Sequence, residues 1–283
     1  MRYPLISALL ALLMQLHPAG TVALESPSVL VKFNELQRDA RSQYWKDRQQ
    51  WGQLPEALPA ATVDRGLTAI EQVPLLEAGV ENNYRGFATG QLLFMTPERE
   101  VRSCTATFVA SSNMLITAAR CIVSPEGVLH SHFIFLSGAT SSTPIYYDIS
   151  CVAYPEQWTR KERSRAWRYN YAFLKTHRTS VFEGLGITNA LVFDKLAQIG
   201  FTDEESEEES IRGIENDSYM TGDGLLGSRY TPLGAGSSGN PWVRSHVIYS
   251  VTSHYDPAHP DLLFGPRFSY ATMELMARVK EEC

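Results

Sequence analysis

This sequence has little net charge, few long helical periodicities and no long apolar run beyond its first 23 residues. A bilayer-spanning helix needs about 20 apolar residues, so no membrane span is expected in the body of the chain. The net charge of −6 gives no reason to expect nucleic-acid binding. What remains are short β-rich segments separated by glycine and proline, within a length of 283 residues. They favour an all-β protein with many short strands, as one large domain or two small ones.

The first 23 residues have the organisation of a secretory signal. Arg2 supplies a positive charge, Leu5 to Leu16 form a short apolar core, and Thr21 to Ala23 offer small residues for cleavage. An uncleaved anchor is the alternative, but no stop-transfer pattern follows this segment. We therefore expect a secreted protein, periplasmic or extracellular, without membrane association once the signal is removed.

The cysteines form an even set of four, which in an exported chain predicts two disulfides. Cys104 and Cys121 lie in the two arms of a strand–turn–strand pattern, so we expect them to be bonded. Cys151 and Cys283 then pair by elimination. Four reduced thiols would require a cytosolic protein, which conflicts with the signal segment.

Residues 24–78 are predicted to form an N-terminal arm ahead of the main domain. Asn34 is a suitable cap for a helix that runs from Glu35 to Trp51, with Leu36, Tyr44 and Trp51 on a loosely apolar face. The sequence leaves two interpretations of the arm open. It is either a propeptide that is removed on activation or a permanent strap over the domain.

The most informative stretch runs from Cys104 to Val123. Apolar and β-branched residues flank a polar turn at Ser111 to Asn113, a pattern that predicts two neighbouring strands. The stretch resembles the segment around the catalytic histidine of trypsin-like serine peptidases. In that family a Cys-x-(Gly/Ala)-(Thr/Ser) strand leads into Leu-Thr-Ala-(Ala/Gly)-His-Cys.

Later landmarks follow in the order of that family, and Tyr84 to Met95 resembles the first strand of its glutamyl-endopeptidase-like branch. The resemblance implies an all-β fold of two six-stranded antiparallel barrels with a C-terminal helix. We assign the domain to residues 79–283, with barrels at about 79–180 and 181–268 and the helix at 269–282.

The sequence departs from the family pattern at two catalytic positions, the histidine that acts as the base and the aspartate that orients it. The histidine position holds Arg120, whose guanidinium cannot accept a proton near neutral pH. Trp167 to Lys175 resembles the strand that carries the family's aspartate, and that position holds Asn170. The resemblance therefore implies that most hydrolytic rate is lost, on the order of a millionfold when triad members act as a unit.

A second motif, Gly-Ser-Ser-Gly-Asn-Pro from Gly236 to Pro241, resembles the turn that carries the peptidase nucleophile. Ser238 falls on the nucleophile position, and the backbone N–H groups of Gly236 and Ser238 would form an oxyanion hole. The motif has two interpretations once the base is gone. It is a structural turn, or it belongs to an anion-binding cleft in which Arg120 and the N–H donors hold a carboxylate.

A replacement base for Ser238 would have to come from another histidine, the candidates being His130, His132, His177, His246, His254 and His259. Thr252, Ser253 and His254 follow the serine motif and resemble the strand that lines the substrate cleft. A histidine placed there contacts substrate more naturally than it deprotonates the serine.

We therefore expect an exported pseudoprotease that binds a protein or peptide in the former substrate cleft. The alternatives are an active serine endopeptidase with an atypical base and a structural exported protein whose cleft is unused. No cofactor is expected. No metal is expected either, because the acidic run from Asp203 to Ser210 lacks the glycine turn of a calcium site. Asn216 begins a formal N-glycosylation sequon.

Overall fold

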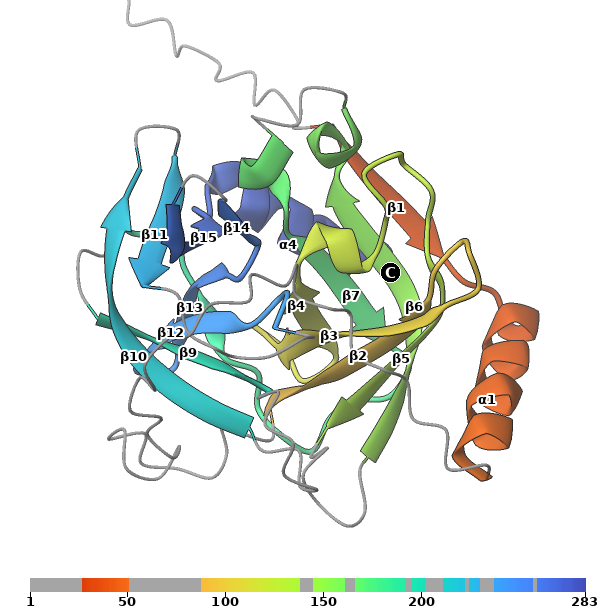
Figure 1. The fold of residues 1–283 in the computed structure, drawn as a ribbon. Coiled ribbons are helices and arrows are strands. Elements are labelled where there is room, and N and C mark those ends of the chain that lie inside the picture. Colours follow the sequence, from red (N-terminus) through yellow and green to blue (C-terminus); the bar gives the residue numbers. More distant parts are fainter. Residues whose placement is uncertain are drawn as a thin grey trace, which may run out of the picture.

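A computed structural model describes residues 27–50, 88–137, 145–160, 166–191, 195–201, 211–221, 224–229, 237–256 and 259–283. The signal segment, Trp51, Tyr84, the acidic run at 203–210 and Gly236 lie outside the described residues. Two β-sheets lie side by side, with one helix near the start of the described chain, after its first strand, and another at its end (Figure 1). Within the described ranges, no helix is long and apolar enough to cross a membrane.

The first sheet is a closed six-stranded barrel, because its end strands β6 and β7 pair with each other. Around the barrel the order is β6-β5-β2-β3-β4-β7. The strands are β2 (Thr89–Met95), β3 (Val101–Phe108), β4 (Met114–Thr117), β5 (Ser131–Ser137), β6 (Ile145–Pro155) and β7 (Ala172–Thr176). Buried aromatic rings fill its interior, among them Phe94, Phe108, Phe133, Phe135 and Phe173.

The second sheet has eight strands in the order β14-β15-β11-β10-β9-β12-β13-β8. The strands are β8 (Gly186–Ile187), β9 (Lys195–Phe201), β10 (Ile211–Met220), β11 (Leu225–Arg229), β12 (Pro241–Arg244), β13 (Val247–Val251), β14 (His254–Asp256) and β15 (His259–Pro266). Among the described residues no ladder joins its two ends, so the predicted second barrel stays a prediction.

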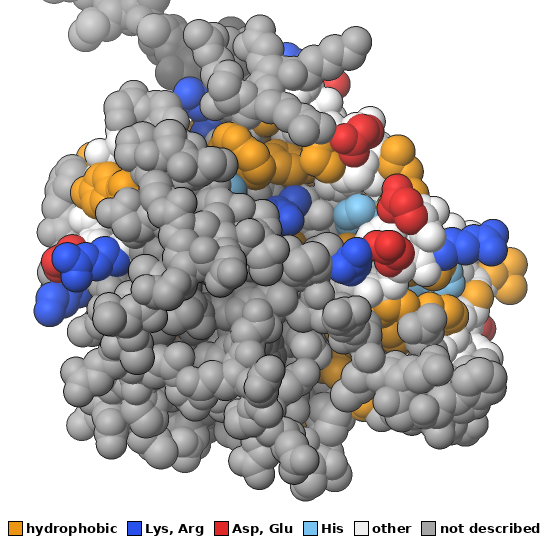
Figure 2. All heavy atoms as spheres, in the orientation of Figure 1, with side chains coloured by type: hydrophobic (Ala, Val, Ile, Leu, Met, Phe, Trp, Pro, Cys, Tyr) orange, Lys and Arg blue, Asp and Glu red, His pale blue; other side chains and the backbone are white. Residues whose placement is uncertain are grey.

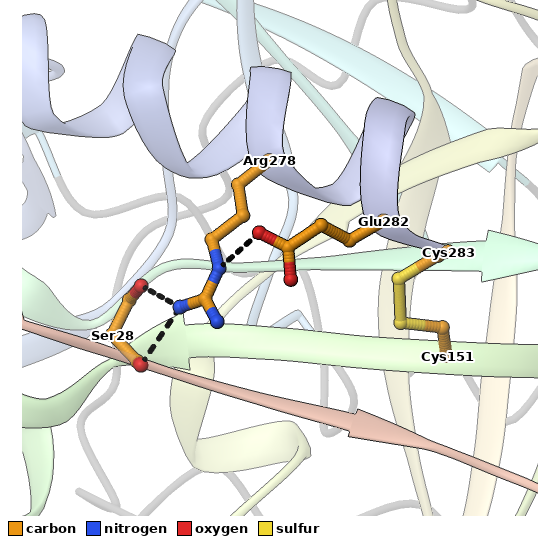
Figure 3. Close-up of polar contacts among 5 residues, drawn as sticks. All are labelled: Ser28, Cys151, Arg278, Glu282 and Cys283. Carbon is orange, nitrogen blue, oxygen red and sulfur yellow. Dashed lines mark hydrogen bonds and ion pairs between the residues drawn. A yellow bond between two sulfur atoms is a disulfide. The ribbon is translucent and has the colours of Figure 1, made fainter.

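The C-terminal helix and both disulfides follow the sequence-based expectations. Helix α4 (Tyr270–Glu282) begins after Ser269, whose backbone N–H is accepted by Thr272 Oγ1 at 3.0 Å. The disulfides join Cys104 to Cys121 and Cys151 to Cys283. The second one ties the end of α4 to β6, so the terminal helix is covalently fixed to the barrel (Figure 3).

The described part of the arm is integrated into the barrel. Strand β1 (Ser28–Lys32) pairs antiparallel with β6 and adds a seventh strand to the first sheet. Arg278 on α4 donates from Nη1 to the Ser28 carbonyl at 3.1 Å and to Ser28 Oγ at 2.8 Å (Figure 3). Its Nε donates to Glu282 Oε1 at 2.9 Å, which holds the guanidinium in place. The arm and the terminal helix therefore anchor each other.

Helix α1 (Glu35–Gln50) confirms the predicted arm helix, with Asn34 Oδ1 accepting the Gln37 N–H at 2.9 Å. The predicted apolar face is wrong in one respect. Leu36 is 81% exposed. Trp45, which follows Tyr44 on the same helix and was not part of the predicted face, is only 7% exposed and packs against the barrel. The helix is so polar that its few apolar residues do not define the docking face from sequence alone.

Candidate functional site

The hairpin that carries Arg120 folds as its residue pattern predicts. Thr107 and Phe108 in β3 pair with Ile116 and Leu115 in β4, across a turn at residues 111–113. The chain then leaves β4 in a short 3₁₀ turn, η1 (Ala119–Cys121), in place of a longer second strand. The disulfide to β3 fixes the end of this turn, and Arg120 is left partly exposed between two buried neighbours.

Asn170 contacts this turn through its side chain. It follows a second 3₁₀ turn, η3 (Trp167–Tyr169), and its side chain is fully buried. Asn170 Oδ1 accepts the backbone N–H of Arg120 at 2.9 Å. Because a backbone N–H can only donate, this bond fixes which end of the amide is oxygen. The Nδ2 group then donates to Ser253 Oγ at 2.7 Å.

The network continues from Asn170 into the second sheet. Ser253 is buried, and its Oγ also lies 3.1 Å from His254 Nδ1. Since Ser253 Oγ accepts from Asn170, its own hydrogen is available for His254 Nδ1. The His254 ring is stacked on Trp167, with centroids 4.0 Å apart. Asn170, Ser253 and His254 thus form one chain of hydrogen bonds that begins at the buried Asn170 and ends at the partly buried His254.

The turn that carries Ser238 is held against the first barrel by backbone contacts. The Thr105 N–H donates to the Ser238 carbonyl at 2.9 Å, and the Gly239 N–H donates to the Thr252 carbonyl at 2.9 Å. The Cys121 sulfur lies 3.9 Å from the Ser238 carbonyl oxygen, but a disulfide sulfur has no hydrogen to donate. Ser238 therefore lies at the junction of the two sheets, next to the turn that holds Arg120.

Gly239 is required by the close approach of this turn to the barrel. Its φ of +87° lies in the left-handed region, where a side chain is strained. A Cβ atom at this position would also overlap the Thr105 carbonyl and Thr117 Oγ1. Thr117 Oγ1 already donates to that carbonyl at 2.6 Å, so the site has no room to relax.

An aromatic cluster borders the site on the side of η3. Trp158, in the 3₁₀ turn η2 (Glu156–Thr159), is tilted against Trp167 at 5.5 Å, and Phe264 lies 5.5 Å from His254. A cavity of about 400 Å³ opens beside the two tryptophans; it is lined by Pro125, Glu126, Trp158, Thr159, Arg160, Ala166 and Trp167. Acidic and basic side chains are interspersed on the described part of the face in Figure 2.

The His130 ring contacts the backbone carbonyl of Arg120, which the sequence did not predict. It is 7% exposed, stacks on Phe94 at 4.8 Å, and its Nε2 lies 3.2 Å from the Arg120 carbonyl oxygen. Burial lowers the pKa of His130, although this contact and the charge of Glu98 act in the opposite direction. A neutral ring that donates from Nε2 is therefore the favoured state.

The structure brings most of the predicted site residues together. Arg120, Asn170, Ser253 and His254 are linked by contacts. Ser238 lies in the adjoining turn, and Thr252, just after β13, is hydrogen-bonded to that turn. Gly236 lies outside the described residues, so the predicted oxyanion hole stays a prediction. The sequence pointed to His130 only as a candidate base for Ser238 and did not predict its contact with the Arg120 carbonyl or the stacking of Trp167 on His254. The only sequence signal for these roles is that the histidine lies near Arg120 and the tryptophan near Asn170.

A closed six-stranded barrel, a second sheet and a C-terminal helix, with the two motifs meeting between the sheets, define the fold of trypsin-like serine proteases. No protein-family profile matches the sequence, and no curated protein matches it either. The likeness is found in three dimensions. The crystal structure of protease Anisep from Arthrobacter nicotinovorans is 18% identical, with a TM-score of 0.59, covering 70% of this chain and 97% of that one.

Two other solved structures illustrate the range of this fold. A Glu endopeptidase is 15% identical with a TM-score of 0.55, covering 70% of this chain and 91% of that one. An inactivated protease paralogue of the scabies mite is 13% identical with a TM-score of 0.53, covering 72% of this chain and 98% of that one. At these identities the likeness shows the fold alone.

Proposed function

We propose that this chain is an exported pseudoprotease, which binds a peptide or protein in the cleft between its sheets and does not hydrolyse it. Arg120 carries the proposal. The likeness of its motif to the family pattern supports taking Arg120 as the residue at the catalytic-histidine position. Its backbone N–H is bonded to Asn170 and its carbonyl contacts His130. A guanidinium has a pKa above about 12 and cannot take the proton of Ser238 near neutral pH. Without a base, the serine hydroxyl is a weak nucleophile.

The network around His254 argues against the alternative, an active endopeptidase with an atypical base. Ser253 Oγ accepts from Asn170 Nδ2, and its own hydrogen is available to His254 Nδ1. In that arrangement a neutral His254 carries its proton on Nε2, and its Nδ1 lone pair already accepts the Ser253 hydrogen, so neither nitrogen is free to take up the proton of Ser238. Its ring is also held by stacking between Trp167 and Phe264.

The ligand proposed for the cleft is a peptide with a carboxylate at the bound end. Arg120 is partly exposed and permanently charged, and a guanidinium pairs with a carboxylate in a two-pronged geometry. The cavity beside Trp158 and Trp167 offers apolar walls for a neighbouring side chain of the same ligand. Export is supported by the two disulfides, which persist in oxidising compartments.

The finer family placement also belongs to this proposal. The second sheet would complete a second barrel, and the chain would be related to the glutamyl-endopeptidase-like branch. The likeness of Tyr84 to Met95 to the first strand of that branch supports the placement, as does the Glu endopeptidase among the similar structures.

The absence of hydrolysis is tested with a fluorophosphonate probe, which labels an activated serine. We expect no adduct at Ser238 when the folded protein is incubated with the probe and analysed by mass spectrometry. Casein hydrolysis gives a second readout. Either an adduct at Ser238 or casein cleavage that disappears in Ser238→Ala would overturn the proposal of inactivity.

Binding is tested separately with a fluorescent peptide library in two forms, one with free C-terminal carboxylates and one with C-terminal amides. We expect binding of carboxylate peptides only, and a loss of roughly ten- to hundredfold in Arg120→Gln, the size of a charged hydrogen bond. Arg99→Gln is the matched control, because Arg99 is an exposed arginine on the turn that joins β2 to β3. Equal binding of both peptide forms, or an equal loss in both variants, would contradict the carboxylate assignment.

A further inference from the structure

The N-terminal arm docks on an irregularity of the first barrel. Strands β2 and β5 pair Leu93 with Ile134 but Met95 with Ser131. Two residues of β5, His132 and Phe133, therefore lie opposite the single residue between Leu93 and Met95, which is a β-bulge. Bulges leave a backbone group out of the ladder and redirect the strand next to them.

The arm holds this bulge from two directions. Trp45 donates its indole N–H to the carbonyl of His132 at 2.7 Å, and the ring of Tyr44 lies 4.7 Å from the His132 ring. Phe33, between β1 and α1, lies 6.0 Å from Phe133. Trp45 also packs on Leu93, Ile134 and Leu136, so the contact is apolar as well as polar.

The bulge residue is strained. His132 has a φ of +55°, a left-handed conformation that residues other than glycine adopt only at an energetic cost. Such a conformation persists only where the surroundings enforce it. The hydrogen bond from Trp45 to the His132 carbonyl is one such contact, and it comes from outside the barrel.

Two residues earlier, the same strand segment supports the candidate site. His130 donates its backbone N–H to the Ile122 carbonyl at 2.9 Å, and its Nε2 meets the Arg120 carbonyl at 3.2 Å. Its ring is stacked on Phe94, the residue of β2 that faces the bulge. The bulge therefore lies next to both the backbone and the ring contacts of His130.

We propose that the arm is a positioning element for the candidate site. In this role Trp45 fixes the bulge at His132 and thereby holds the His130 ring against the Arg120 carbonyl. This rests on the proposed function in so far as Arg120 is the binding group. The arm then belongs to the working protein as a permanent strap and is not a propeptide to be discarded. Undocking of α1 would loosen the Arg120 turn and weaken ligand binding there.

Hydrogen exchange of single backbone amides tests this coupling without any ligand. The Arg120 amide is the reporter, because its N–H is bonded to Asn170 Oδ1. In Trp45→Phe, which keeps an aromatic ring and removes the N–H donor, we expect Arg120 to exchange roughly three- to tenfold faster, the effect of losing one hydrogen bond. The Gly186 amide, bonded to the His246 carbonyl in the second sheet, should not change.

Leu36→Ala is the matched control, since Leu36 is on the same helix and 81% exposed. It should leave the exchange of Arg120 unchanged. A double-mutant cycle completes the test: in a His130→Phe background, Trp45→Phe should have no further effect on Arg120. Unchanged Arg120 exchange in Trp45→Phe, or additive effects in the cycle, would overturn the positioning role.

Two outcomes separate this inference from the proposed function. Faster exchange of Arg120 with no carboxylate binding supports the positioning role and removes the binding proposal. Carboxylate binding that depends on Arg120 but is equal in wild type and Trp45→Phe retains the binding proposal and removes the positioning role.

Discussion

The Asn170 amide accepts the Arg120 backbone N–H at 2.9 Å with one end and donates to Ser253 Oγ at 2.7 Å with the other. An aspartate carboxylate at the same place would accept from both neighbours. An amide at this position therefore donates to Ser253 where a carboxylate would accept, which leaves the Ser253 hydrogen available to His254 Nδ1. Arg120, Asn170, Ser253 and His254 are thus linked in one hydrogen-bonded network.

Removal of this amide should destabilise the fold. Asn170 is fully buried, and Asn170→Ala leaves the Arg120 N–H and Ser253 Oγ without this partner, at a cost of roughly 1–3 kcal/mol for a buried polar group. Urea unfolding measures the free energy directly. Asn170→Asp is the control, because its carboxylate still accepts from both neighbours and should cost less. An Asn170→Ala variant as stable as wild type would contradict the role of the network.

Restoring both altered positions should restore reactivity at Ser238. Arg120→His combined with Asn170→Asp is expected to give fluorophosphonate labelling at Ser238 that neither single variant gives. A histidine without its carboxylate partner loses about ten-thousandfold in rate, so the two changes must act together. Labelling must disappear when Ser238→Ala is added. A folded double variant that stays inert would place the loss of activity elsewhere in the cleft.

Local patterns in the sequence were sufficient for much of the fold. The hairpin around Ser111 to Asn113, the pairing of Cys104 with Cys121 and the terminal helix after Ser269 each depend on residues near one another in sequence. Turn chemistry and apolar spacing therefore predict them. The meeting of Arg120 with Asn170 was reachable only through the likeness to trypsin-like peptidases, because 50 residues separate them.

The arm and its contacts could not be predicted in this way. Nothing in residues 28–32 indicates that they pair with β6. The docking of Trp45 depends on a bulge at His132, which is 87 residues away in the sequence. The positive φ of His132 could not be predicted either, because this conformation usually indicates a glycine and the residue is a histidine. Long-range backbone pairing and local strain are set by tertiary packing, which overrides the local propensities that a single sequence displays.

A side chain at Gly239 should be poorly tolerated. Gly239→Ala introduces a Cβ that overlaps the Thr105 carbonyl and Thr117 Oγ1 at a φ of +87°. Gly224→Ala is the matched control, since Gly224 has a φ of +82° but nothing near its added Cβ. Thermal unfolding should show a loss of about 1 kcal/mol for the control and several times more for Gly239→Ala. Equal losses would mean that backbone conformation alone, and not contact with the barrel, selects glycine here.

Stability should depend on pH through His130. Burial lowers the pKa of His130 below its ordinary value of 6.5 in the folded state. As pH falls, the unfolded state therefore takes up the proton first. The stabilising contribution of neutral His130 is complete above pH 6.5 and declines as pH falls from 6.5 toward the lowered folded-state pKa. Below that pKa both states are protonated and the loss stops growing.

The measurement is the free energy of unfolding from urea titrations at several pH values between about 7.5 and 4.5, a window that brackets the ordinary histidine pKa. In His130→Phe, which keeps a ring to stack on Phe94, the part of the pH dependence due to His130 should vanish. His246→Gln is the control, because His246 is exposed in the turn between β12 and β13 and should leave the profile unchanged. Carboxylates contribute the same background to all three proteins, so the difference curves isolate the imidazole.

A His130→Phe profile parallel to that of wild type would contradict this prediction. It would mean that His130 is accessible to protons in the folded protein, and that its contact with the Arg120 carbonyl does not depend on a neutral ring.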